Sequence, residues 1–217
     1  MGEDRQGCEY QAAPMSEPRP KIQTGHRDPG SLAITPPQIV GPFYPVSERP
    51  DEASDLVRPS GSTGEAQGQL IHIRGRVLTP SGAPVAHACI DIWQANAVGK
   101  YRHRSDTNPA PLDPNFKGFA RIVTDVSGRY SFRTIKPGSY PTAEGDIRPP
   151  HIHLAVEGQF DRLVTQVYFA GEAENLTDRW LNAAPHPERL ILALQDPPSH
   201  LEEHALVAHF DIVLAKG

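Results

Sequence analysis

The sequence is short of cysteine, of long apolar runs and of basic excess, and each shortage excludes a class of protein. Its two cysteines, Cys8 and Cys89, are too few for a disulfide framework, so we expect reduced thiols and a cytoplasmic location. No stretch approaches the ~18 consecutive apolar residues of a membrane-spanning helix, and the polar residues 1–6 lack the apolar core of a signal peptide. Lys and Arg number 21 against 26 Asp and Glu, a net charge of −5. We therefore expect neither a nucleic-acid nor a membrane partner.

Proline and histidine are the two abundant residue types. The 23 prolines are roughly twice the usual share and indicate loops and turns rather than long helices. The ten histidines are compatible with metal binding, with acid–base chemistry or with neither. The proline-rich residues 1–36 are predicted to be a flexible or surface-draped lead, and residues 37–217 to form one folded domain, which this length favours.

From residue 69 onward, apolar and polar side chains alternate with the period of two that is typical of strands. Only residues 187–195 have the pattern of a short helix, and the prolines of residues 39–45 favour an extended segment that docks on the domain. The prediction is an all-β protein: a β-sandwich of mostly antiparallel strands with long loops and one or two short helices. The expected strands are 69–78, 88–94, 119–124, 129–134, 151–156, 163–169 and 209–214.

The clearest local motif is a pair of histidines, His151 and His153, directly after Pro149 and Pro150. Residues i and i+2 of a strand point to the same face, so both imidazoles can meet one metal ion. Such pairs also occur as surface or hydrogen-bonded core residues. The prolines favour a site because they stiffen the start of the strand.

Two tyrosines on predicted loops are candidates for further ligands. Tyr101 follows the strand that contains Trp93, and Tyr140 lies in a Gly-Ser-Tyr-Pro turn. Catalytic groups are frequent on loops, although a tyrosine at the rim with its hydroxyl in water is the alternative for each.

Several motifs, in order along residues 70–214, resemble those of the intradiol ring-cleaving dioxygenases. The likeness is greatest to the iron-bearing β subunit of protocatechuate 3,4-dioxygenases. The run from Asp91 to His103, which contains Trp93-Gln94-Ala95-Asn96 and Tyr101, carries the likeness most clearly. The other runs are 112–118, 132–141, 148–153, 165–171 and 210–214.

The resemblance implies one non-haem Fe(III) per chain, bound by Tyr101, Tyr140, His151 and His153. Phenolate oxygen suits a hard ferric ion, whereas zinc prefers sulfur or nitrogen. The implied reaction is cleavage of a catechol by O2 between its two hydroxylated carbons, which gives a cis,cis-muconate-type product.

The resemblance also assigns roles around the metal. Tyr140 leaves the iron and takes one catechol proton, Arg148 stabilises negative charge on the ring, and Gln166 supports Arg148. The alternatives are a salt bridge at the rim for Arg148 and a plain strand residue for Gln166. Trp93 either packs under Tyr101 or fills the core.

Four residues are expected at the substrate pocket: Gly41, Pro42, Trp93 and Thr142. Gly41 and Pro42 lie in a segment that resembles the start of the family's α subunit, which lines the pocket; the alternative is a strand that seals the core. Thr142 stands where protocatechuate-type enzymes have a tryptophan, and the following loop is shorter, so the identity of the catechol stays open. The long helical dimerisation region of other family members is missing. Gly41 and Pro42 are expected to line the pocket of their own chain or of a neighbouring chain, so we expect a homo-oligomer, with or without a homologous second subunit.

The sequence leaves two alternatives to ring cleavage open. A non-catalytic, pre-albumin-like β-sandwich binding module would need none of the four ligands. A metal-dependent hydrolase would combine His151 and His153 with a carboxylate such as Asp106 or Asp113.

Overall fold

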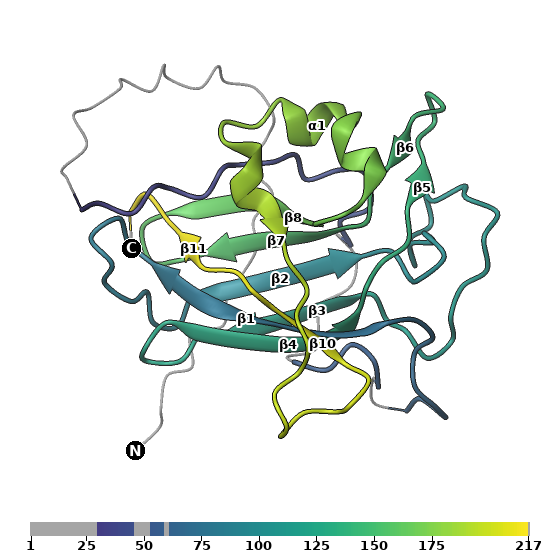
Figure 1. Cartoon of the computed structure of the whole chain (residues 1–217), viewed down its shortest axis with the longest axis horizontal. Coiled ribbons are helices and arrows are strands. Elements are labelled where there is room, and N and C mark those ends of the chain that lie inside the picture. Colours follow the sequence, from purple (N-terminus) through teal and green to yellow (C-terminus); the bar gives the residue numbers. More distant parts are fainter. Residues whose placement is uncertain (1–29, 46–52, 59–60, 217) are drawn as a thin grey trace.

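The computed structural model describes residues 30–45, 53–58 and 61–216, and in this part of the chain two β-sheets pack face to face (Figure 1). The predicted all-β sandwich is confirmed. Most of the expected lead, residues 1–29, lies outside the described residues.

The first sheet is built around β1 (Leu70–Leu78). β4 (Arg129–Ile135) pairs antiparallel with β1, while β10 (Leu206–His209) and β11 (Ile212–Val213) both run parallel to it.

The expected strand 209–214 is therefore wrong as a single element. Between β10 and β11 the chain crosses β1 at Gly75, where an added Cβ would lie 1.9 Å from the carbonyl oxygen of Phe210. That carbonyl accepts a hydrogen bond from the hydroxyl of Tyr130 at 2.6 Å, and the carboxylate of Asp211 accepts one from the backbone N–H of Arg76 at 2.8 Å. These groups take the place of ladder hydrogen bonds, so the strand is interrupted.

The second sheet has the order β3 (Phe119–Val123), β2 (Cys89–Gln94), β7 (His151–Glu157), β8 (Arg162–Phe169) and β9 (Ile191–Leu192). Its first four strands are antiparallel, and β9 runs parallel to β8. The register places His153 opposite Trp93 on one side and Gln166 on the other.

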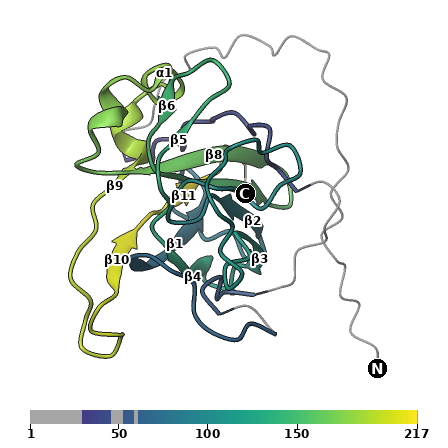
Figure 2. The same cartoon turned by 90° about the vertical axis from the view of Figure 1, so that its right-hand side faces the viewer.

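Alternation along β7 separates the core from the site. Ile152, Leu154 and Val156 belong to the apolar cluster between the two sheets, so His151 and His153 lie on the opposite, outer face. Residues 36–44 run along this outer face, and the N–H of Gln38 donates to the carbonyl of Val164 at 2.8 Å. The segment crosses beside β8 in Figure 1, and Figure 2 shows the same arrangement from the side. As a result β7 is buried on both faces.

Short helices and a small hairpin complete the fold. The hairpin pairs β5 (Tyr140–Pro141) with β6 (Ile147–Arg148). Between β8 and β9 lie the 3₁₀ turns η1 (Ala173–Leu176) and η2 (Pro187–Leu190) and the single-turn helix α1 (Arg179–Asn182). The helix expected over 187–195 is wrong beyond Leu190, because Ile191–Leu192 pair with the free edge of β8.

The buried Cys89 is disulfide-bonded. The expectation of reduced thiols is therefore wrong at this position. Among the described residues, no helix is long and apolar enough to cross a membrane.

Candidate metal centre

The structure brings Tyr101, Tyr140, His151 and His153 together on the outer face of the second sheet. Tyr101 comes from the loop after β2, Tyr140 from β5, and both histidines from β7. The two phenol rings meet nearly at right angles, with centroids 5.4 Å apart. The hydroxyl of Tyr140 lies 3.5 Å from Nε2 of His151, which lies 3.2 Å from Nε2 of His153. All four side chains are at most 8% exposed.

Hydrogen bonding fixes the protonation of His151. Its Nδ1 lies 2.8 Å from the carbonyl oxygen of Pro149. A carbonyl only accepts, so Nδ1 carries the hydrogen and the lone pair of Nε2 points toward His153. Without a metal, one hydrogen held between the two Nε2 atoms satisfies this pair.

The same geometry fits a metal ion. Two nitrogens that bind one ion at ~2.1 Å each must lie within roughly 4.2 Å of one another, and the observed 3.2 Å satisfies this condition. The buried hydroxyl of Tyr101 has no hydrogen-bond partner among the described residues. Such an unpartnered polar atom is costly unless a bound group satisfies it. Two oxygen and two nitrogen donors form a set that suits iron.

Burial shifts the pKa values of all four groups toward their neutral forms. Burial, followed by the positive charge of Arg148, lowers the pKa of both His151 and His153 well below its usual value. Burial, followed by the neighbouring Tyr140, raises the pKa of Tyr101 well above its usual value. Burial also raises the pKa of Tyr140, with Arg148 opposing it. The histidines are thus neutral, as ligands must be, whereas the phenols need a nearby cation to ionise.

Local side-chain bonds hold the loop that carries Tyr101. The carboxylate of Asp106 accepts from the backbone N–H of Tyr101 at 2.7 Å, and the side chain of Asn96 accepts from the N–H groups of Val98 and Lys100. Asp106 therefore supports the loop.

The two carboxylates considered for a hydrolase are engaged elsewhere. Besides the Tyr101 bond, Asp106 accepts from the N–H of Asn108 at 2.8 Å. Asp113 accepts from the N–H of Gln67 at 2.7 Å. Within residues 30–45, 53–58 and 61–216, no group of three His, Cys, Asp or Glu is arranged to hold a metal. The structure gives the hydrolase hypothesis no support.

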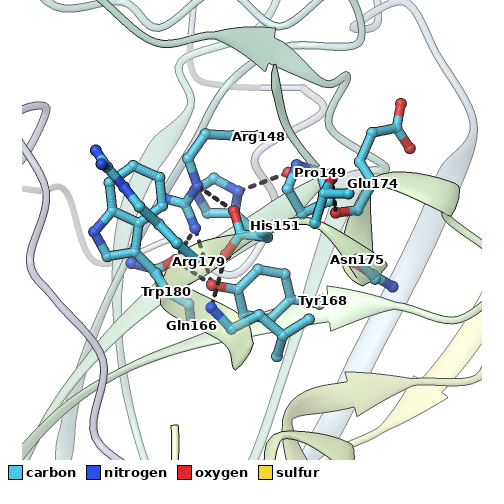
Figure 3. A network of polar contacts seen from close by, with 12 residues as sticks. Arg148, Pro149, His151, Gln166, Tyr168, Glu174, Asn175, Arg179 and Trp180 are labelled. Atoms are coloured by element: carbon cyan, nitrogen blue, oxygen red, sulfur yellow. Dashed lines mark hydrogen bonds and ion pairs between the residues drawn. The ribbon is translucent and has the colours of Figure 1, made fainter. Parts of the chain in front are cut away.

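Arg148 is the centre of a buried polar network beside His151 (Figure 3). It is 3% exposed and lies opposite Tyr140 in the β5–β6 pair. Its Nη2 donates to the amide oxygen of Gln166 and to the hydroxyl of Tyr168, both at 2.9 Å, and its Nε donates to Asp178 at 2.8 Å. Burial disfavours the charged guanidinium, but Tyr168, Tyr140 and Asp178 outweigh it and raise the pKa of Arg148.

The structure places Trp93 under His153 instead of under Tyr101. The indole and imidazole stack with centroids 4.6 Å apart and 12° between their planes. Gly41 packs against the imidazole of His153. A Cβ added at Gly41 would lie 3.2 Å from Cε1 of His153, and the backbone φ of +75° at Gly41 favours glycine.

The other two expected pocket residues are less enclosed. Pro42 is exposed, next to Gly41. Thr142 is half-buried beyond Tyr140, and its backbone N–H donates to the carbonyl of Asp146 at 2.7 Å.

Sequence reasoning missed four residues at this site: Phe43, Tyr168, Asp178 and Trp180. The ring of Phe43 lies 4.5 Å from that of Tyr101. Tyr168 lies two residues after Gln166 on β8, and that spacing alone places both on one face. No comparable signal marks Asp178 or Trp180, since they join the site from the helical segment after β8.

A β-sandwich that gathers two buried tyrosines and two histidines at one point defines a candidate metalloenzyme. The sequence model of the Dioxygenase family matches residues 39–216. The chain therefore belongs to the intradiol dioxygenase family.

Individual relatives agree with this assignment. The protocatechuate 3,4-dioxygenase beta chain of Burkholderia cepacia is 42% identical over 178 residues, which cover 80% of this chain and 76% of the relative. Catechol 1,2-dioxygenase 2 of Acinetobacter lwoffii is 33% identical over 64% of this chain. The match covers about half of the length of that relative (52%).

The structural comparison gives the same family. The dioxygenase domain of a dioxygenase–carbohydrate-binding fusion protein from Streptomyces sp. SirexAA-E superposes with a TM-score of 0.64 at 26% identity. The match covers 85% of this chain and all of that domain, 100%.

Proposed function

We propose that this chain cleaves a catechol with O2 between its two hydroxylated carbons and releases a cis,cis-muconate-type product. One non-haem Fe(III) would be held by Tyr101, Tyr140, His151 and His153. The observation that carries the proposal is the convergence of two buried phenols and two neutral imidazoles, with the hydroxyl of Tyr101 unpartnered among the described residues. Family membership supports it.

Each protein group has a distinct task in this proposal. A bound ferric ion would ionise the phenols and the catechol hydroxyls and activate the ring toward O2. Tyr140, which lies opposite Arg148 in the β5–β6 pair, accepts a catechol proton at its phenol oxygen. Arg148, supported by Gln166, stabilises the negative charge that develops on the ring.

The substrate is a catechol whose substituents meet Gly41, Pro42, Thr142 and Phe43. The relatives named above are a protocatechuate and a catechol dioxygenase. Thr142 is small and the β5–β6 hairpin is short, so the pocket would accept a substituent on that side.

We also propose that the chain assembles into an oligomer, as a homo-oligomer or with a homologous subunit. The beta-chain name of the relative in Burkholderia cepacia supports an assembly of more than one chain. Ile39 and Val40, next to Gly41, are exposed apolar side chains that a neighbouring chain would cover.

The direct test is O2 uptake by the iron-loaded protein across a panel of substituted catechols. Tyrosinate-to-ferric charge transfer should colour the protein red, and ring cleavage should yield muconate-type acids in equal amount to the O2 consumed. A colourless protein that stays inert after iron reconstitution would contradict the proposal and favour the binding-module hypothesis.

A further inference from the structure

We propose that Asp178 is a positioning residue that fixes the guanidinium of Arg148 for ring cleavage, an inference that rests on the proposed function. Asp178 lies 30 residues along the chain from Arg148 and directly precedes α1. Its Oδ2 accepts from Nε of Arg148 at 2.8 Å, and the two side chains are only 1% and 4% exposed. They form a buried ion pair.

The first argument concerns charge. A guanidinium remains charged at all ordinary pH values, and a buried charge is costly without a counter-charge. The other two hydrogen-bond partners of Arg148, Gln166 and Tyr168, are neutral. Within the described part of the chain, Asp178 is the one carboxylate in an ion pair with Arg148. It therefore supplies the anion that keeps this cation in the buried site.

The second argument concerns direction. Asp178 holds Nε, while Gln166 and Tyr168 hold Nη2. The indole of Trp180 packs on the guanidinium, 4.4 Å from its Cζ. None of these groups accepts from Nη1, so the hydrogens of that nitrogen remain for a further acceptor.

The third argument is that Asp178 is itself held in place. Its second oxygen, Oδ1, accepts from the N–H of Leu181 at 2.7 Å and caps α1. Leu181 is buried in the core cluster. One carboxylate thus serves two donors, one from the helix and one from Arg148, and the position of the helix determines the orientation of the guanidinium.

This double role makes Asp178→Asn informative. Asparagine has the same size but a single carbonyl oxygen, so it cannot serve both the Leu181 N–H and the Arg148 Nε–H, and it carries no charge. Asp178→Ser keeps the helix cap without reaching Arg148. The matched control is Glu172→Gln, which breaks the pair with Lys136 in the same helical region.

The first measurement needs neither iron nor turnover. In metal-free protein with isotope-labelled arginine, the NMR signal of the Arg148 Nε–H, assigned by its loss in Arg148→Lys, reports hydrogen exchange. We expect slow exchange in the wild type and in Glu172→Gln, and exchange at least about tenfold faster in both Asp178 variants. Unchanged exchange would overturn the positioning role, whatever the activity.

The second measurement is the steady-state kinetics of the iron-loaded protein. We expect kcat to fall at least about tenfold in Asp178→Asn, with iron content, colour and KM retained, because the loss acts on the transition state. An unchanged kcat per iron alongside faster exchange would overturn the catalytic part and leave Asp178 a purely structural residue. A wild-type protein that cleaves no catechol would overturn the proposed function, and with it the role of Asp178 in catalysis. The exchange measurement on metal-free protein would still show whether Asp178 holds the guanidinium of Arg148, so the two failures can be distinguished.

Discussion

The indole of Trp93 lies parallel to the imidazole of His153, at a centroid distance of 4.6 Å. Gly41 approaches the same imidazole at its Cε1. The ring is therefore confined by a strand residue and by the N-terminal segment, and its orientation does not depend on a bound ion. Preorganisation of this kind reduces the cost of ordering a ligand when the ion binds.

Gly41→Ala should disturb the metal centre because the new methyl group would lie 3.2 Å from His153 in a backbone with a φ of +75°. The control is Gly171→Ala, with a φ of +88° and nothing within 4 Å of the added atom. Both should lose ~1 kcal/mol of unfolding free energy from the left-handed conformation. Only Gly41→Ala should weaken iron binding, measured by metal analysis and by the charge-transfer band. Equal iron affinity in both variants would contradict the contact with His153.

Tyr140→Phe should keep part of the iron and lose most of the turnover. The variant retains three ligands but lacks the phenol oxygen that accepts the catechol proton, so O2 uptake should fall ~100-fold or more. Tyr130→Phe is the control, since this buried hydroxyl bonds to the carbonyl of Phe210, away from the site. It should lose stability without loss of colour or turnover per iron. Wild-type O2 uptake by Tyr140→Phe would exclude the proton-accepting role.

Asp91→Ala should destabilise the fold near the N-terminal segment. The carboxylate of Asp91 accepts from Nε and Nη2 of Arg121, at 2.6 and 2.9 Å, and from the hydroxyl of Tyr44 at 2.8 Å. Removing it leaves a half-buried cation without this carboxylate, at a cost of ~3 kcal/mol in unfolding free energy by urea denaturation. Arg58→Ala breaks an exposed pair with Glu65 and should cost less than ~1 kcal/mol. Similar losses of unfolding free energy in the two variants would show that burial of the Asp91–Arg121 pair does not increase its contribution to stability.

The metal-free protein should lose stability as the pH falls below about 6.5. Burial lowers the folded-state pKa of His151 and His153, so below that pH the unfolded chain binds protons that the folded chain does not. The stability present above the unfolded pKa is lost as the pH falls toward the lowered folded pKa. Unfolding free energies at several pH values should show a smaller slope in the double variant His151→Asn, His153→Asn. The exposed His200→Gln should leave the slope unchanged; a slope shared by all three proteins would rule out this origin.

The strands and the two histidines of the candidate site were predictable because both follow short-range periodicity. Alternation marks β1, β2, β4, β7 and β8 directly, and the same period of two puts His151 and His153 on one face. The tyrosines were accessible only through the resemblance, because nothing in their local sequence distinguishes a ligand from a rim residue.

The remaining features depend on contacts between distant segments. Ile191 and Leu192 have an apolar pattern that fits a helix as well as a strand. They form a strand because they pair with the open edge of β8. Leu56 and Val57 are buried in the core although they lie in a segment rich in Pro, Ser, Gly and Glu. Asp178, which follows β8 in the sequence, bonds to Arg148, which precedes β7; no local sequence pattern encodes this contact.

The strict alternation along β7 also links metal content to correct strand pairing. A one-residue slip of β7 between β2 and β8 would turn Ile152 and Leu154 to the outer face and direct both imidazoles into the apolar layer. Chains paired in that way would lack two of the four donors and bind no iron. For the proposed iron site, the ratio of iron to protein in a preparation would therefore also count the molecules whose central sheet has formed in the native register.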